Sequence, residues 1–168
     1  MEIEKFLRKF YRHYRVKFLT LLKEKTFNNR VDYMHFKRGS EDLVIVFSGF
    51  GGEVPHYNYV TSLIDSPRDL LFIKDTFGYK GSYYLCENGN FEPEAIVSQL
   101  IDKIAGWGGY KHLFTVGSSK GGTAAIYYGL KHKATAVYAG ACQYYIGTYL
   151  KVDTHKRILE AMLGKNYS

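Results

Sequence analysis

The strongest chemical signal in the sequence is a serine between two glycines, Gly117, Ser119 and Gly121, with the spacing G-x-S-x-G. An apolar run at 112–116 precedes this motif, and an alanine-rich helical pattern at 123–131 follows it. A strand that bends sharply into a helix lifts the serine hydroxyl clear of the sheet, which is the nucleophile elbow of serine acyl-transfer enzymes. The glycines leave room for the neighbouring strand and helix. The motif therefore predicts Ser119 as a nucleophile; an anion-binding turn and a purely structural turn are the alternatives.

Backbone N–H groups beside Ser119 are the expected donors to an oxyanion. The helix after the serine directs its first N–H groups and its positive dipole end toward the site, so we expect Lys120 N–H to be one donor. The second is expected from the glycine stretch 48–52 that follows an earlier strand, at Phe50 or Gly51. A P-loop phosphate cradle is not indicated, because Lys120 precedes the glycine pair instead of following it.

The general base is not evident from the sequence. His56 follows the glycine stretch and His155 opens the last helical pattern, so both are weak candidates, and a solvated surface position is the expectation for His155. His112 lies at the opposite end of its predicted strand from Ser119, and the other histidines have ordinary surface patterns. No His, Cys, Asp or Glu cluster has metal-ligand spacing, so neither a metal nor a cofactor is expected.

Alternating strands and helices must position these residues. Short apolar runs that predict strands occur at 43–47, 69–73, 112–116 and 134–139, and those at 43–47 and 112–116 are typical of buried strands. Helical patterns at 93–105 and 123–131 separate the later runs. This order predicts an α/β fold with a mostly parallel sheet and helices on both faces. Residues 31–38 are expected to add an edge strand, and 83–86 a short extension.

Charge is concentrated at the N-terminus. Residues 1–30 carry a net charge of +6, and the other 138 residues only +1. An amphipathic helix is predicted over 2–25, which gives two segments: a basic helix in 1–30 and the main domain in 31–168. The helix is expected either to rest on an anionic membrane surface or a partner, or to pack on its own domain with a solvated basic face. Nucleic-acid binding is not expected, because the charge is confined to one helix.

The remaining sequence features favour a cytoplasmic protein. No apolar run reaches the roughly 20 residues that span a bilayer, and no secretory signal is evident. Cys86 and Cys142 lie in or beside apolar runs and are expected to be buried free thiols. Many tyrosines fall near the glycine loops, where they either stack on sugars or pack as ordinary half-buried residues.

Several blocks together resemble a known family, the XcbB/CpsF-type capsular polysaccharide biosynthesis proteins, and are also similar to the hydrolase-like acyltransferase of the bacterial accessory secretion system. The blocks are 44–52, 72–78, 80–85, 117–125 and 141–150. The resemblance implies an α/β-hydrolase fold, a serine nucleophile at Ser119 and ester formation or removal on a sugar hydroxyl of a surface glycan.

In α/β-hydrolase folds the acid and the histidine follow the serine after further strands. The 29 residues after Ala139 leave no room for two such strands, so we expect a chain truncated at its C-terminus. Two functions follow from these observations. The first is a serine acyltransferase or esterase acting on a capsular glycan precursor. The second is a catalytically inactive scaffold in a capsule-biosynthesis or secretion complex.

Overall fold

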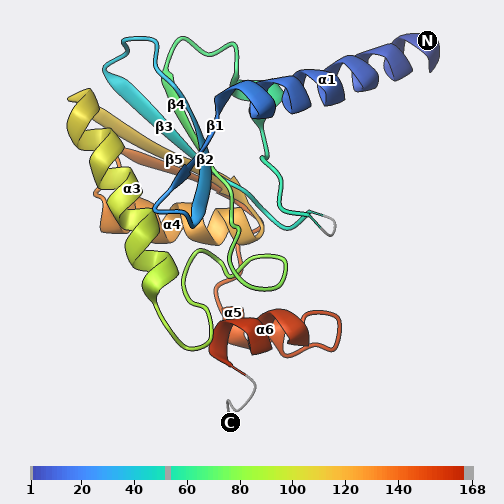
Figure 1. The fold of residues 1–168 in the computed structure, drawn as a ribbon, viewed down its shortest axis with the longest axis vertical. Helices are drawn as coiled ribbons and strands as arrows, with labels where there is room; N and C mark the ends of the chain where they lie inside the picture. Colours follow the sequence, from blue (N-terminus) through green and yellow to red (C-terminus); the bar gives the residue numbers. More distant parts are fainter. Residues whose placement is uncertain (1, 52–53, 165–168) are drawn as a thin grey trace.

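The computed structural model describes residues 2–51 and 54–164, drawn in Figure 1. Gly52, the last residue of the glycine stretch, lies outside this description. The elements in chain order are α1 (Glu2–Lys23), β1 (Glu24–Phe27), β2 (Val31–Phe36), β3 (Asp42–Phe47), α2 (Val60–Leu63), β4 (Asp69–Ile73), α3 (Glu92–Gly108), β5 (His112–Ser118), α4 (Lys120–Lys131), β6 (Ala136–Gly140), α5 (Ile146–Leu150) and α6 (Lys156–Leu163).

The strands form one sheet in the order β1-β2-β4-β3-β5-β6. β3 pairs in parallel with β4 and β5, and β5 pairs in parallel with β6. β2 pairs antiparallel with both β1 and β4. The predicted α/β fold with a mostly parallel sheet is therefore confirmed. Because parallel strands all end at the same side of the sheet, the loops after β3, β4, β5 and β6 meet there.

The edge strand differs from the prediction. Residues 31–36 do form a strand, but β1 covers its outer side, so β2 lies inside the sheet. A tight turn makes this possible: Asn28 and Asn29 both have positive φ, at 49° and 55°. The N–H of Arg30 closes the turn by donating to the carbonyl of Phe27 at 3.0 Å. Asparagine tolerates this left-handed conformation better than most residues.

Helices cover both faces of the sheet, as predicted. The side chains of β3 alternate, with Leu43, Ile45 and Phe47 packed toward α3 and α4. Val44 and Val46 face the other way, toward α2 and the C-terminal half of α1. A strand buried on both faces in this way explains the uninterrupted apolar run in its sequence.

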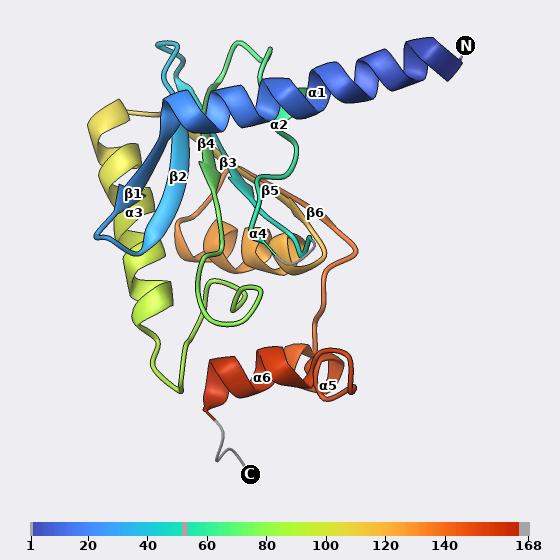
Figure 2. The ribbon, with the colours of Figure 1, turned by 45° about the vertical axis from the view of Figure 1, so that its right-hand side comes forward.

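α1 combines parts of the two alternatives left open by the sequence. Its C-terminal half packs on the domain through Val16 and Leu19, and Arg15 pairs with Asp65 at 2.6 Å. Its N-terminal half extends beyond the sheet, as Figures 1 and 2 show. Leu21 is 83% exposed, and among the side chains of α1 that the structure describes, Phe10, Tyr11, Tyr14, Phe18 and Leu22 are exposed as well. Much of the described apolar surface of α1 is therefore exposed instead of buried against the domain.

The C-terminal helices pack on loops that follow the parallel strands. α5 and α6 lie below the sheet in Figure 1 and form a small core with residues of the β4–α3 loop, including Tyr83 and Cys86. Turn residues 88 and 89 donate backbone hydrogen bonds to carbonyls of α6. The strand extension expected at 83–86 is wrong, because Tyr83 and Tyr84 adopt positive φ and form a turn.

Both cysteines are free thiols, but only one is buried. Cys86 is buried, and this burial raises the pKa of its thiol. Cys142 is exposed, which corrects the prediction for that residue, because the segment after β6 runs over the surface instead of into the core. In the part of the chain that the structure describes, no helix is both long and apolar enough to cross a bilayer.

Candidate active site

Ser119 occupies the tight turn between β5 and α4. Its backbone has φ 53° and ψ −126°, a conformation that non-glycine residues rarely adopt. The turn is held from outside, because the N–H of Ser119 donates to the carbonyl of Gly140 at 2.8 Å. The strand–turn–helix arrangement predicted from the motif is present, and the side chain of Ser119 is half-buried beside a cavity.

The two glycines of the motif are needed for packing between backbones. A Cβ added to Gly117 would lie 2.0 Å from the carbonyl oxygen of Gly121. A Cβ on Gly121 would lie 2.4 Å from the carbonyl oxygen of Phe47, at the end of β3. The elbow is therefore pressed against the start of the glycine loop, which brings the two predicted sources of oxyanion donors next to each other.

The N–H groups predicted to hold an oxyanion are free to do so. Lys120 is the first residue of α4, where an N–H has no partner within the helix. In the glycine loop, Gly49 N–H is already bound to Asn58 Oδ1 at 2.7 Å. Among the described residues, none accepts a hydrogen bond from the N–H of Phe50 or Gly51. The use of Lys120 N–H and of Phe50 or Gly51 N–H as oxyanion donors stays a prediction.

A cavity of about 400 Å³ opens in front of Ser119. His155 lines it, together with Phe50, Tyr149 and residues of the β4–α3 loop and α6. The imidazole of His155 is stacked between two rings, 4.9 Å from Tyr149 and 6.2 Å from Phe50, centre to centre. His155 is thus half-buried at the site, and the expectation of a solvated surface histidine was wrong.

His56 does not line the Ser119 cavity. Its Nδ1 lies 3.1 Å from the carbonyl oxygen of Gly51. Its ring fills the space that a side chain at Gly51 would take, with Cε1 at 1.4 Å from an added Cβ. On its other side it lines a separate groove of about 720 Å³ next to α1. The position of His56 is that of a support for the glycine loop.

Gln143 is the hydrogen-bond partner of the Ser119 hydroxyl, and sequence reasoning did not select it. Its Nε2 donates to Ser119 Oγ over 3.3 Å, and its Oε1 accepts from the hydroxyl of Tyr83 over 3.3 Å. The side chain of Thr123 fixes the Gln143 backbone through bonds to both its N–H and its carbonyl. Burial raises the pKa of Tyr83, so its hydroxyl remains a donor to Gln143 at neutral pH. Among the described histidines, none lies within hydrogen-bonding distance of Ser119 Oγ.

A buried ion pair lies directly behind the elbow. Lys120 Nζ is 2.8 Å from Asp75 Oδ2, and the two side chains are 2% and 0% exposed. The same carboxylate oxygen accepts the backbone N–H groups of Ser82 and Tyr84 at 2.9 and 3.2 Å. The ammonium group also lies 5.1 Å from the ring centre of Phe50, on the glycine loop. The pair therefore connects the elbow, the glycine loop and the β4–α3 loop.

The tyrosines expected near the site divide into several groups. Tyr79 and Tyr149 line the cavity, whereas Tyr83 and Tyr84 are buried beneath it. Tyr144 and Tyr145 are exposed. Only the first group is placed to touch a ligand in front of Ser119. No set of three or more acidic, histidine or cysteine side chains in the described residues is arranged to hold a metal ion.

Comparison with known proteins gives structural neighbours only. No protein-family model and no curated protein matches the sequence. A capsule O-acetyltransferase of Neisseria meningitidis serogroup A, as a histidine-to-alanine variant in complex with CoA, matches with a TM-score of 0.70 and 28% identity over 84% of this chain. A structure of the same enzyme with caged gadolinium gives 0.67 and 25% over 82% of this chain. The Gap123 glycosylation-associated complex of Streptococcus agalactiae gives 0.65 and 18% over 83% of this chain.

These neighbours support the fold. The acetyltransferase and the glycosylation-associated protein have the same α/β arrangement, and both are named for work on capsules or glycosylation. The chain spans 58% of the length of the first and 29% of the second. At 18% identity the second likeness concerns the fold alone.

Proposed function

We propose that this chain carries the nucleophile of a serine acyltransferase that esterifies a hydroxyl of a bacterial capsule polysaccharide. The observation that carries the proposal is the strained position of Ser119, on a cavity and at the start of α4. The likeness to a capsule O-acetyltransferase supports transfer over hydrolysis, and the CoA complex of that enzyme supports an acyl-CoA donor.

In the proposed reaction, Ser119 Oγ attacks the thioester carbonyl while a base takes its proton. The oxyanion accepts hydrogen bonds from the N–H of Lys120 and of Phe50 or Gly51. Collapse of this intermediate breaks the C–S bond, and CoA leaves as the thiol with the proton that the base held. A sugar hydroxyl then gives its proton to the base and attacks the acyl-serine. Its collapse forms the glycan ester and returns the proton to Ser119.

The base in this proposal is a histidine. Among the described histidines, His155 is the one that shares the cavity with Ser119, so it is the first to test. Gln143 holds the serine hydroxyl in the observed arrangement, and a base would have to displace this hydrogen bond. His155→Gln should slow acylation of Ser119, whereas His56→Gln should leave the chemical step unchanged at saturating donor. A wild-type rate for His155→Gln would assign the base to another histidine.

The proposal is tested by trapping the acyl-enzyme. The chain is incubated with acetyl-CoA, free thiol is measured, and intact mass and peptide mapping locate the acetyl group. We expect acetylation of Ser119 and none in Ser119→Ala. Ser118→Ala is the matched control, because this residue precedes the elbow on the same strand and is also half-buried. Acetylation that persists in Ser119→Ala would refute the assignment.

A non-catalytic scaffold is the second candidate function. The observation that favours it is the contact of Ser119 Oγ with a neutral amide and with no described histidine. In cells, Ser119→Ala would then leave capsule acetylation intact. Loss of acetylation with a normal level of the variant protein would exclude the scaffold and support the enzyme.

We further propose that α1 contacts an anionic membrane surface. The support is its exposed apolar residues together with the +6 charge of residues 1–30. The protein should sediment with vesicles that contain phosphatidylglycerol and not with pure phosphatidylcholine vesicles. Leu21→Glu and Phe18→Glu together should abolish this sedimentation, and equal binding to both vesicle types would contradict the proposal.

A further inference from the structure

The cavity in front of Ser119 is cationic. Two permanent cations, Lys80 and Arg157, line it, and none of the described residues in its lining is an Asp or a Glu. We propose that Lys80 and Arg157 form a subsite for a phosphate group of the substrate. This inference rests on the proposed function, in which the cavity receives the reacting molecules.

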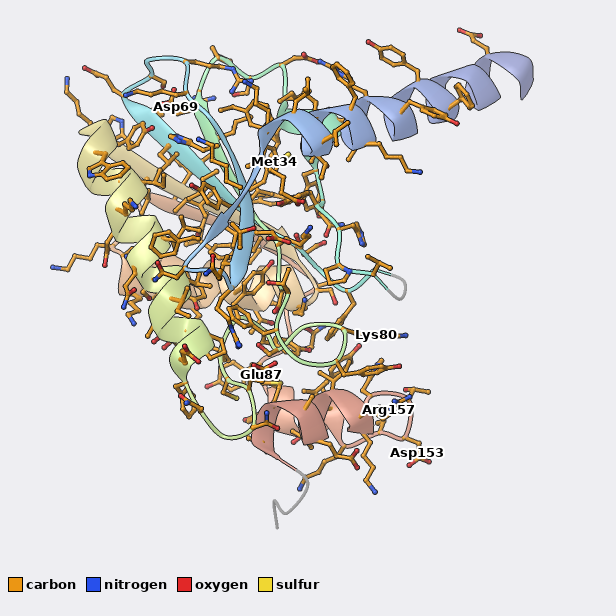
Figure 3. All side chains as sticks on the ribbon, in the orientation of Figure 1. Met34, Asp69, Lys80, Glu87, Asp153 and Arg157 are labelled. Atoms are coloured by element: carbon orange, nitrogen blue, oxygen red, sulfur yellow. The ribbon has the colours of Figure 1, made fainter. Side chains whose placement is uncertain are left out.

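The two cations come from different parts of the chain and meet at one aromatic ring. Arg157 lies in the first turn of α6, and Lys80 lies in the β4–α3 loop. The guanidinium carbon of Arg157 is 4.3 Å from the ring centre of Tyr79, and Lys80 Nζ is 5.4 Å from the same centre. Figure 3 shows both labelled side chains on the same side of the molecule. Tyr79 thus orders two positive charges at the cavity wall.

Neither cation is neutralised within the described structure. No described carboxylate lies within 4.0 Å of Lys80 or Arg157, whereas Lys74, Lys120 and Lys131 each have an acidic partner. Asp153, labelled in Figure 3, is exposed and does not line the cavity. The fold therefore places both cations around one ring on the cavity wall with no described carboxylate paired to either, and an anion in the cavity would be attracted to both charges.

The backbone at Lys80 supports a built site. Lys80 has a φ of 61°, in the left-handed region, between two glycines of positive φ. The loop is fixed from beneath, because Ser82 and Tyr84 donate to the buried carboxylate of Asp75. These buried contacts hold the loop that carries Lys80 in one position at the cavity wall.

Phosphate is the anion that this pair fits best. The guanidinium group of arginine offers a planar fork that matches two phosphate oxygens, and a lysine ammonium adds a point charge. The phosphate has two sources under the proposed function, a phosphate of the CoA donor or a phosphate of the glycan acceptor. Both present the same chemistry, and the probes below separate them.

The test is a set of affinities measured by calorimetry on the full chain. The probes are CoA, dephospho-CoA, pantetheine and glucose 1-phosphate, and the variants are Lys80→Gln and Arg157→Gln. Lys156→Gln is the matched control, because it removes an exposed charge next to Arg157 that does not line the cavity. Thermal unfolding of each variant checks that the fold is kept.

We expect each site variant to weaken binding of the phosphate-bearing ligand about tenfold or more, and to leave pantetheine binding unchanged. If the site variants bind CoA more weakly, the phosphate belongs to the donor. If they bind only glucose 1-phosphate more weakly, it belongs to the acceptor. Wild-type affinity of both variants for every probe would overturn the proposal. An equal loss with pantetheine, or with Lys156→Gln, would overturn it as well.

The outcome is independent of the serine chemistry. Ser119→Ala should bind the phosphate probes as the wild-type protein does. If no acetyl-serine forms but the phosphate series holds, the proposed acyl transfer fails and the subsite stands. If Ser119 is acetylated but the site variants bind every phosphate-bearing probe with wild-type affinity, only the proposed subsite fails.

Discussion

The buried ion pair of Asp75 and Lys120 should contribute strongly to the stability of the fold around Ser119, and substitutions of its two members test this contribution. Asp75→Asn removes the negative charge but keeps an oxygen that accepts the N–H groups of Ser82 and Tyr84. The ammonium of Lys120, 2% exposed, then has no carboxylate partner. Removing one member of a buried ion pair costs about 3–5 kcal/mol. For a chain of this size that corresponds to a fall in Tm of roughly 6–20 °C.

Replacing the lysine of this pair should lower the free energy of unfolding by less than replacing the aspartate. Lys120→Met leaves the Asp75 carboxylate with three backbone donors, the N–H groups of Ser82, Tyr84 and Phe77 at 2.9, 3.2 and 3.4 Å, so the buried charge stays partly compensated. The loss is then near that of one hydrogen bond to a charged group, about 1.5–3 kcal/mol. The double variant should lose less than the sum of the two, because it leaves no unpaired ammonium.

Urea unfolding followed by circular dichroism measures these differences, with the slope m required to stay constant. Lys111→Met is the control, because its pair with Glu41 is 65% exposed on both sides and should contribute little. The reasoning is refuted if Asp75→Asn shifts the midpoint no more than this control. It is also refuted if Lys120→Met proves the more damaging change.

Two further predictions concern the elbow and the histidines. Gly121→Ala should destabilise the protein, because its Cβ would lie 2.4 Å from the Phe47 carbonyl oxygen. Gly106→Ala in α3 meets no atom within 4 Å and should raise the free energy of unfolding by about 0.5–1 kcal/mol. Urea midpoints compare the two variants, and an unchanged midpoint for Gly121→Ala would contradict the close approach. Burial lowers the pKa of His35 and of His132 in the folded protein from 6.5. As the pH falls, these two residues therefore bind protons in the unfolded chain before they do so in the folded chain, and the free energy of unfolding should decrease below pH 6.5. Replacing both with Gln should flatten the midpoint-versus-pH profile between pH 7 and pH 5, and an unchanged slope would contradict this account.

The sheet and the elbow were predictable because their signals are local. Continuous apolar runs mark β3, β4 and β5, since strands covered on both faces have no polar side. Each predicted parallel strand begins and ends within two residues of its observed position. The position of Ser119 follows from the glycines on either side, which a tight approach of backbones requires.

The parts that sequence reasoning missed depend on distant contacts. β1 has the mostly polar sequence Glu-Lys-Thr-Phe and follows directly on a helix, so its strand state comes from pairing with β2. Gln143 reaches Ser119 because Thr123 and Tyr83, from two other segments, hold it there. A lysine in a glycine-rich turn is expected to be solvated, and only the fold brings Asp75, 45 residues earlier, beneath Lys120.

Under the proposed function, these contacts would give Lys120 two separate roles in the site. Its backbone N–H is placed by the start of α4 and is the first expected oxyanion donor. Its side-chain ammonium lies 5.1 Å from the ring centre of Phe50, whose own N–H is a candidate for the second donor. The Asp75 carboxylate fixes that side chain, and it also fixes the loop that carries Lys80. Loosening the buried pair should therefore disturb both oxyanion donors and the cationic wall together, although Asp75 itself touches no substrate.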